Sequence, residues 1–339
     1  LMNSSQELLE RITRPSPRLI DDIAKISGDI MIVGAGGKVG PSLAVTARRA
    51  CEAAGLTKRI LAVSKLDDPA AAETMRDWGV QVVEADLLDS QQLDALPEMD
   101  NILFLAGRKF GTYKNQADTW AANVLLPAKI CERFPKAGIV AFSTGNIYGD
   151  RPARCGGSVE TDAPNPDGEY GQTCLGRERV FSYYARRNKT RSLMFRLNYA
   201  VDLRYGVLYD IAKNVRDGIP IKLGRSVLNC IWQGDVCEYA IRALLHVDAP
   251  PAVLNVTGPE TFSTRWAAER FGDLLGRAPL YEGEEQNGGI FSNSSKLMEL
   301  MGYPSVCLER MIRWQAQWIL DGGSSIAAPT HFDAADGVY

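Results

Sequence analysis

The chain has 339 residues, enough to bury a large hydrophobic core, and 45% of them are hydrophobic and 23% charged. A formal net charge of −3 gives no general electrostatic reason to bind nucleic acid or an anionic membrane. No apolar run is long enough to span a bilayer. Seven scattered cysteines without a C-x-x-C pair favour reduced thiols, and the two histidines argue against a histidine-built metal site. We therefore expect a cytoplasmic protein without nucleic-acid, membrane or metal partners.

Residues 1–28 precede the first predicted strand. Apolar residues at helical spacing fall there into two sets, and Pro15 and Pro17 separate them. This pattern predicts two short amphipathic helices packed on the outside of the main domain.

The segment from Asp29 to Gly40 (DIMIVGAGGKVG) joins an apolar run to a glycine-rich turn, and a helix-like stretch follows it. One glycine permits a tight turn, another lets the backbone approach phosphates, and a third lets the helix pack closely on the strand. The helix N-terminus adds free N–H groups and the positive end of a dipole. The pattern predicts a dinucleotide pyrophosphate site, with an ordinary strand-to-helix turn as the alternative. The residues expected to form it are Gly34, Gly36, Gly37, Lys38, Val39 and Gly40.

Apolar segments then alternate with helix-like stretches. The strands are predicted at 59–64, 80–84, 101–106, 138–143 and 192–197, and the helices at 69–78, 115–134 and 170–187. Such alternation predicts a parallel sheet covered by helices on both faces, with ligands at the carboxyl ends of the strands. The expected fold class is therefore α/β, a doubly wound parallel sheet of the Rossmann type.

Beyond Tyr199 the pattern becomes irregular, with a helix near 205–217 and strand-like segments at 227–232 and 252–256. This change indicates a smaller C-terminal substrate lobe. The expected domains are a helical extension (1–28), a dinucleotide-binding domain (29–198), a substrate-binding lobe whose late strands return to the main sheet (199–320) and a tail (321–339).

Polar or small side chains stand where several predicted strands end. Asp86 follows the third strand, where a carboxylate could meet an adenine amino group, and small residues end the fourth strand, so that a flat ring could lie close. The fifth strand ends in hydroxyls, and Tyr170 opens the next helix. A strand-end hydroxyl and a tyrosine that reach one substrate oxygen suit the exchange of a carbinol and a carbonyl.

These features resemble the extended short-chain dehydrogenase/reductase superfamily, in its NAD-dependent epimerase/dehydratase branch. The resemblance covers about residues 29–320. It rests on GAGGKVG, Asp86-Leu87, LAG at 105–107, Asn123 in AANVLLPAKICE, FSTGNIYGD, YGQTCLGRE, RLN at 196–198 and IWQGDVCEYAIRAL at 231–244.

The resemblance implies roles for particular residues. Tyr170 would be the acid/base, and Thr144 would hold the substrate oxygen. The cofactor site would include Asp86, Leu87, Leu105, Ala106, Gly107 and Asn123. The resemblance also implies a homodimer, in which the helices at 115–134 and 170–187 pair across a two-fold axis.

One residue departs from the family pattern Y-x-x-x-K, because Cys174 stands fourth after Tyr170. In the family that lysine hydrogen-bonds the nicotinamide ribose and lowers the pKa of the tyrosine, which is ~10 for a free phenol. A neutral thiol cannot supply the charge. We favour a small apolar filler over a nucleophile as the role of Cys174.

Three explanations for the missing lysine remain open. The charge of an oxidised nicotinamide could suffice, another cation could substitute, or the site could no longer transfer hydride in the usual way. Arg177 is the candidate cation on the same helix face, and Arg108 and Lys109 follow the fourth strand. Possible catalytic support is thus assigned to Cys174, Arg177 and Ser143.

Ser64 and Lys65 follow the second strand, where the cofactor preference is set. A hydroxyl and a cation suit a 2′-phosphate, and Lys38 adds charge, so the sequence favours NADP over NAD. Asp67 and Asp68 follow closely and keep NAD open through a shift of one or two residues.

Polar residues at the predicted strand ends indicate an oxygen-rich substrate, such as a sugar or polyol. The candidates are Arg108, Lys109, Asn146, Asn198, Tyr199 and Trp232.

The sequence thus predicts an NAD(P)-dependent oxidoreductase or epimerase acting on a hydroxyl or keto carbon. A non-catalytic NAD(P)-binding sensor or assembly protein is one alternative. A nucleotide-sugar epimerase or dehydratase is the other, weakened by Leu228 and Asn229 where a cation is common.

Overall fold

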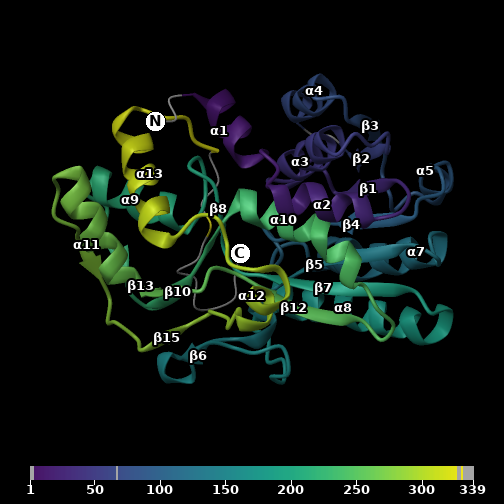
Figure 1. Cartoon of the computed structure of the whole chain (residues 1–339). Coiled ribbons are helices and arrows are strands. Elements are labelled where there is room, and N and C mark those ends of the chain that lie inside the picture. Colours follow the sequence, from purple (N-terminus) through teal and green to yellow (C-terminus); the bar gives the residue numbers. More distant parts are fainter. Residues whose placement is uncertain (1–3, 66–67, 327–329, 331–339) are drawn as a thin grey trace.

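A seven-stranded parallel sheet forms the centre of the computed structural model, which describes residues 4–65, 68–326 and 330 (Figure 1). The strand order is β12-β7-β5-β4-β1-β2-β3, and every neighbouring pair is parallel. The strands are β1 (Ile30–Val33), β2 (Ile60–Ser64), β3 (Gln81–Glu84), β4 (Asn101–Phe104), β5 (Gly138–Thr144), β7 (Arg191–Leu197) and β12 (Ala252–Val256). The predicted fold class is confirmed.

The chain reverses direction across the sheet beside β1. It runs outward from β1 to β2 and β3, then returns to place β4 on the other side of β1. Such a reversal opens a crevice at the carboxyl ends of the two central strands. The glycine turn after β1 therefore lies at this crevice.

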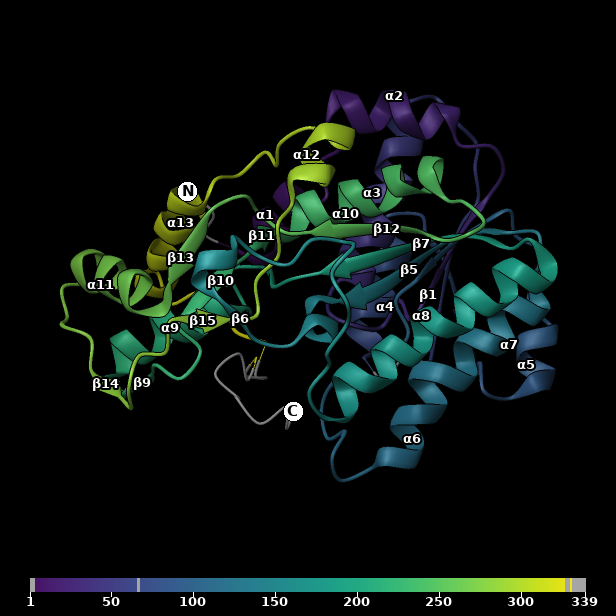
Figure 2. The same cartoon turned by 90° about the horizontal axis from the view of Figure 1, so that it is seen from below.

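Helices cover both faces of the sheet, as Figure 2 shows. One face carries α2 (Pro17–Lys25), α3 (Gly40–Ala53), α10 (Gln233–Arg242) and α12 (Ser295–Met301), with α4 (Pro69–Asp77) beside α3. The other face carries α5 (Ser90–Asp94), α7 (Leu126–Arg133) and α8 (Gly168–Asn188). Because both faces are covered, central strands such as β1 are buried along their whole length.

A second lobe builds its own hydrophobic core from α9 (Val207–Asp217), α11 (Thr264–Leu275) and α13 (Leu308–Leu320). Its short strands are β8 (Ala200–Val201), β9 (Ile221–Lys222), β10 (Val227–Asn229), β11 (Ile231–Trp232), β13 (Thr261–Ser263) and β14 (Tyr281–Glu282). Beside it, β6 (Arg151–Pro152) pairs with β15 (Gly288–Gly289). The prediction of one strand over 227–232 is wrong, because β10 pairs with β13 and β11 pairs with β8.

The predicted helix over 115–134 also divides. It consists of α6 (Gln116–Trp120), a π-helical turn η1 (Ala121–Leu125) and α7. The remaining short helical turns are η2 (Gly145–Tyr148), η3 (Ala153–Cys155) and η4 (Ala243–His246). None of the helices in the described part of the chain has the length and apolar character that a bilayer span requires.

The N-terminal extension forms two helices that link both cores. The side chain of Ser4 caps α1 (Ser5–Ile12), and that of Ser16 caps α2. Leu8 of α1 is buried in the core of the second lobe, whereas Ile23 of α2 is buried in the main core. The extension thus packs on both lobes, and not only on the main domain.

Shortening Ile23 to alanine tests this link. The side chain is fully buried, so Ile23→Ala leaves a cavity and should lower the free energy of unfolding by about 2–5 kcal/mol. Asp21→Ala, at an exposed position of the same helix, should change it by about 0.5 kcal/mol or less. Urea denaturation of the full chain measures both values, and equal effects would contradict the packing of α2.

Candidate active site

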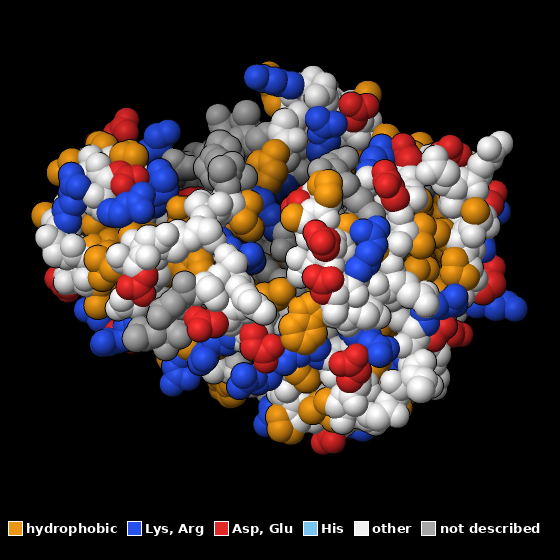
Figure 3. Space-filling model, turned by 90° about the horizontal axis from the view of Figure 1, so that it is seen from above, with side chains coloured by type: hydrophobic (Ala, Val, Ile, Leu, Met, Phe, Trp, Pro, Cys, Tyr) orange, Lys and Arg blue, Asp and Glu red, His pale blue; other side chains and the backbone are white. Residues whose placement is uncertain are grey.

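A cavity of about 420 Å³ lies at the carboxyl edge of the sheet, between the two lobes. Figure 3 shows a hollow between the lobes, with Lys and Arg side chains at its border. The sequence-predicted residues that line the cavity are Gly34, Gly37, Lys38, Val39, Gly40, Leu105, Gly107, Lys109, Ser143, Thr144, Asn146, Tyr170, Asn198 and Tyr199. Sheet, glycine turn and second lobe therefore meet at one site.

The glycine turn closes through two very tight contacts. Gly34 has a φ of +84°, and a Cβ there would lie 2.5 Å from the backbone nitrogen of Ala106. A Cβ on Gly40 would lie 2.3 Å from the carbonyl oxygen of Ala35. Neither position accepts a side chain without displacing backbone. Gly36 lies on the outer side of the turn, at a neighbouring cavity.

The helix after the turn begins without a side-chain cap. Its N-cap residue is Val39, whose side chain cannot accept a hydrogen bond from the first N–H groups of α3. These N–H groups carry the positive end of the helix dipole. The start of α3 therefore suits an anionic group, as the glycine spacing predicted.

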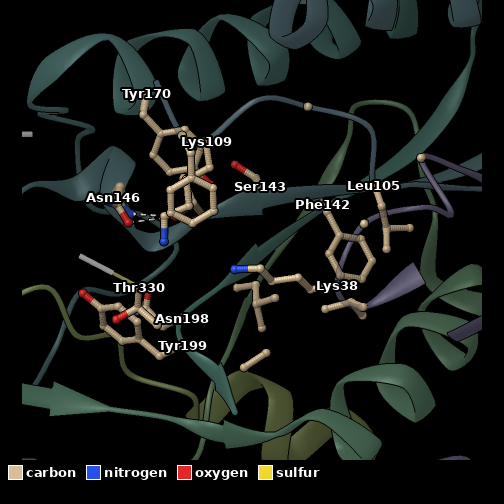
Figure 4. Close-up of a pocket in the computed structure, with 18 of the residues that line it drawn as sticks. Lys38, Leu105, Lys109, Phe142, Ser143, Asn146, Tyr170, Asn198, Tyr199 and Thr330 are labelled. Carbon is tan, nitrogen blue, oxygen red and sulfur yellow. Dashed lines mark hydrogen bonds between the residues drawn. The ribbon is translucent and has the colours of Figure 1, made fainter. Parts of the chain in front are cut away.

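Lys38 adds a buried cation to the turn. Its Nζ atom is buried and hydrogen-bonds none of the described residues. The ammonium lies 3.3 Å from the centre of the Tyr205 ring, and Figure 4 shows it extending into the cavity. Burial, together with the charge of Lys109, lowers its pKa to about 8. A buried ammonium beside free helix N–H groups fits the diphosphate of a dinucleotide.

The residues at the ends of β2 and β3 lie outside this cavity and pair with each other. Lys65 Nζ forms an ion pair of 2.7 Å with Asp86, and this hydrogen bond lowers the pKa of the Asp86 carboxyl. Ser64 ends β2, and the side chain of Leu87 is buried in the core. The carboxylate compensates the lysine charge that suggested a 2′-phosphate site. The structure therefore gives the predicted preference for NADP no support.

Of the two aspartates that kept NAD open, Asp68 lines the neighbouring cavity together with Gly36 and Gly37. Asp68 caps α4, because its carboxylate accepts hydrogen bonds from the N–H groups of Ala70 and Ala71. Asp67 lies outside the described residues.

Thr144 and Tyr170 face the same cavity from different elements. Thr144 ends β5 and donates a hydrogen bond of 3.0 Å to the Asn146 side-chain oxygen. Tyr170 stands in the first turn of α8 and is half-buried (Figure 4). A hydroxyl and a phenol that face one cavity can hold and protonate a single substrate oxygen. Ser143 lines the cavity too, but its hydroxyl donates to Glu178 at 2.6 Å.

Cys174 lies beneath this wall of the cavity. Its side chain is 1% exposed and packs with Ile147 and Tyr148. Burial raises the pKa of the thiol, although the charge of Arg177 and hydrogen bonding to Tyr170 oppose the shift. A neutral, buried thiol agrees with the packing role that the sequence favoured over a nucleophile.

Arg177 binds the protein's own backbone. Its guanidinium donates to the carbonyl of Phe142 at 2.6 Å and to the side-chain oxygen of Asn123 at 2.9 Å. A Cβ on Gly107 would meet this guanidinium at 2.3 Å, so the glycine leaves room for it. Arg177 therefore joins α8 to the end of β5, and it does not line the cavity.

Asn123, in the π-helical turn, holds the loop after β4. It is fully buried, accepts a hydrogen bond from the N–H of Arg108 at 2.8 Å and donates to the Arg108 carbonyl at 3.0 Å. Its amide also donates to Thr173 of α8. Asn123 thus fixes the loop that borders the cavity, through contacts that sequence spacing alone could not reveal.

Three further predicted residues do not line the cavity. The side chain of Arg108 pairs with Asp118 at 3.4 Å, and Ala106 packs against the main core. Trp232 is 2% exposed and packs against Trp314 in the core of the second lobe, with ring centres 5.4 Å apart. The prediction that Arg108 and Trp232 line a substrate pocket therefore finds no support.

Several lining residues were missed by the sequence analysis. They are Phe110, Phe142, Leu197, Ala200, Tyr205, Val207 and Thr330. Tyr205 and Val207 come from the second lobe, and the backbone of Thr330 donates to Asp210 at 2.9 Å. Phe142 and Leu197 belong to β5 and β7, whereas packing of the second lobe brings Tyr205 and Val207 to the sheet edge, which no periodic pattern marks. Among the described residues, no group of three or more His, Cys, Asp or Glu side chains is placed to hold a metal.

A comparison with models of known protein families identifies the family of this chain. A model of the NAD dependent epimerase/dehydratase family matches residues 30–257. The chain belongs to this family. No curated protein sequence matches it.

Several solved structures have a fold similar to that of this chain. UDP-glucose 4-epimerase of Thermus thermophilus, in complex with NAD, has a TM-score of 0.68 and 21% identity over 85% of this chain and 98% of that one. For dTDP-glucose 4,6-dehydratase of Bacillus anthracis with NAD, the TM-score is 0.73, with 15% identity over 87% and 97% of the two chains. UDP-glucuronic acid 4-epimerase of Bacillus cereus, with UDP-glucuronic acid and NAD, has a TM-score of 0.68 and 17% identity, covering 86% and 99%. At these identities the similarity establishes the fold alone.

The buried ammonium of the glycine turn provides a direct test of the cofactor site. Lys38→Met removes a charge with no hydrogen-bonding partner of its own among the described residues, so NAD should bind about 10- to 100-fold more weakly. Lys136→Met, at an exposed position before β5, should leave the affinity unchanged. Calorimetric titration measures both dissociation constants. Equal affinities for Lys38→Met and the wild type would place the diphosphate elsewhere.

Proposed function

We propose that this protein is an NAD-dependent epimerase or dehydratase that acts on a hydroxyl-bearing carbon of a nucleotide-linked sugar. The observation that carries the proposal is the convergence of Thr144 and Tyr170 on the cavity that the glycine turn and Lys38 border. A sugar-like substrate suits the polar wall formed by Asn146 and Asn198. The nucleotide part rests on the similar structures, which include epimerases crystallised with UDP-glucose and UDP-glucuronic acid.

The chain's own residues divide the work of the reaction. Tyr170 moves the proton of the substrate hydroxyl, and Thr144 orients the same oxygen from the end of β5. The N–H groups at the start of α3 and the Lys38 ammonium hold the diphosphate of the dinucleotide. NAD, when bound, supplies the acceptor for a hydride from the adjacent carbon. The second lobe borders the site through Tyr205 and Val207.

We propose NAD as the cofactor, in place of the NADP that the sequence favoured. The ion pair between Lys65 and Asp86 supports this choice, because it neutralises the cation at the end of β2. A carboxylate beside this lysine would also repel the charge of a 2′-phosphate. The family description and the similar structures name NAD as well.

A homodimer is part of the proposal. The resemblance pairs the helices of 115–134 and 170–187 across a two-fold axis, and these elements expose large apolar side chains. Trp120, Leu125 and Tyr183 are 43%, 50% and 48% exposed. Covering them against a second copy would remove apolar surface from water.

Replacing the phenol hydroxyl tests the reaction. Tyr170→Phe should lower turnover by about 100- to 10,000-fold, since a positioned acid/base contributes about that much. NAD binding should be unchanged, because the hydroxyl does not contact the diphosphate. Turnover is measured with UDP-glucose, UDP-glucuronic acid and dTDP-glucose. Tyr303→Phe, at a 74% exposed position after α12, serves as the control. Full activity in Tyr170→Phe would remove the residue from the mechanism, and an inert wild type that binds NAD would favour a sensor.

Releasing Lys65 from its partner tests the cofactor choice. The wild type should bind NAD more tightly than NADP, and Asp86→Asn should improve NADP binding about tenfold, because Lys65 becomes available to a 2′-phosphate. Asp94→Asn removes an exposed charge from nearby α5 and should leave the NAD to NADP ratio unaltered. Calorimetry with both dinucleotides gives this ratio. A wild type that prefers NADP would reverse the assignment.

A further inference from the structure

A phenol that acts as a base near neutral pH needs a positive charge beside it. The pKa of a free phenol is ~10, so its anion is scarce at pH 7. A neighbouring cation favours the anion and lowers the pKa by about one to three pH units. The residue four positions after Tyr170 is a buried cysteine, which supplies no such charge. The candidate site therefore raises the question of which cation acts on Tyr170.

Arg177, the nearest cation along α8, is hydrogen-bonded to groups other than Tyr170. Its guanidinium is buried against the Phe142 carbonyl and the Asn123 side chain. Lys38 lies between two other rings, with its ammonium 4.7 Å from the centre of the Phe110 ring and 3.3 Å from that of Tyr205.

Lys109 lies beside the phenol. It comes from the loop after β4, lines the cavity and is half-buried. Its Nζ atom is 6.0 Å from the centre of the Tyr170 ring, and Figure 4 shows the two side chains next to each other. It also interacts electrostatically with Cys174, as does Arg177, whose charge has the larger effect on the pKa of that thiol. The Lys109 ammonium is therefore close to Tyr170 in the first turn of α8 and also interacts with Cys174, one turn later in the same helix.

The loop that carries Lys109 is fixed from α8 itself. The backbone N–H and carbonyl of Arg108 are both held by the Asn123 side chain, which Arg177 hydrogen-bonds in turn. The residue that follows Arg108 is thus anchored to the helix that carries Tyr170. Arg177 does not line the cavity, but through Asn123 it helps to fix the position of Lys109.

We propose that Lys109 is a positioning residue, which supplies to Tyr170 the positive charge that Cys174 cannot provide. The inference rests on the proposed function, in which Tyr170 is the acid/base. It also explains a neutral residue at position 174, because Lys109 interacts electrostatically with that position and would repel a second ammonium there.

The charge state of Lys109 fits this role. Burial lowers its pKa to about 8, and the charge of Arg225 acts in the same direction, whereas Cys174 and Asp210 oppose the shift. Lys38 faces the same space from the glycine turn and repels Lys109. Lys109 is consequently protonated at pH 7 and loses its charge above about pH 8. The activity of the wild type should therefore fall above that pH.

Titration of the phenol itself tests the proposal without any substrate. The full chain is labelled with ¹³C at Cζ of its 12 tyrosines, and the Tyr170 signal is identified by its loss in Tyr170→Phe. Lys109→Met should raise the pKa of Tyr170 by about one to three pH units, and Lys109→Arg should restore most of the difference. Lys114→Met, at an exposed position of the same loop, should have no effect.

A second pair of variants guards against a merely structural effect. In the Lys109→Met background, Cys174→Lys should return the Tyr170 pKa toward the wild-type value, since the charge then comes from below. Equal Tyr170 pKa values in the wild type, Lys109→Met and Lys109→Gln would overturn the proposal. Calorimetry with NAD on the same samples tests the proposed function separately from the role of Lys109. A chain that binds no NAD would refute the proposed function, while the titration of Tyr170 would still report on Lys109.

Discussion

The approach of backbone to backbone at Gly34 and Gly40 is the constraint on which the site depends. Gly34 presses β1 against the loop that follows β4, and Gly40 presses the start of α3 against Ala35. A side chain at either position would force these segments apart. The same contacts aim the uncapped start of α3 and the Lys38 ammonium into the cavity. Anion binding and the position of the β4 loop thus share one cause.

Buried polar contacts fix the position of Tyr170, the proposed acid/base, relative to the sheet. Helix α8 holds Tyr170 at its start and is tied to the sheet two turns later. Arg177 binds the end of β5, and Glu178 pairs with Arg196 of β7 at 2.7 Å, with both side chains only 7% exposed. Glu178 and Arg196 form an ion pair and the Arg177 guanidinium is hydrogen-bonded, as burial requires. These pairs fix α8 against the strands, so Tyr170 and Thr144 keep their relative positions without a ligand.

Sequence periodicity predicted the parts of the structure that repeat. The apolar runs became the central parallel strands, and the glycine spacing marked the turn at the crevice. Thr144 and Tyr170 were placed at one cavity because strand ends and helix starts share an edge of the sheet. Contacts between distant residues lay beyond such reasoning. Lys65 has its partner at the end of another strand, and Trp232 looked like a pocket residue although it packs against Trp314.

Arg177 illustrates the same limit within a single helix. Helical spacing correctly placed it on the face of Tyr170, but its guanidinium reaches the carbonyl of Phe142 and the side chain of Asn123. The residue beside the phenol is Lys109, from a loop whose path no periodicity encodes. A crystal structure with NAD would test the central claim most directly. The account predicts the diphosphate against the N–H groups of residues 37–40 and Lys38, with the nicotinamide facing Tyr170. A dinucleotide bound elsewhere, or no binding at saturating NAD, would contradict it.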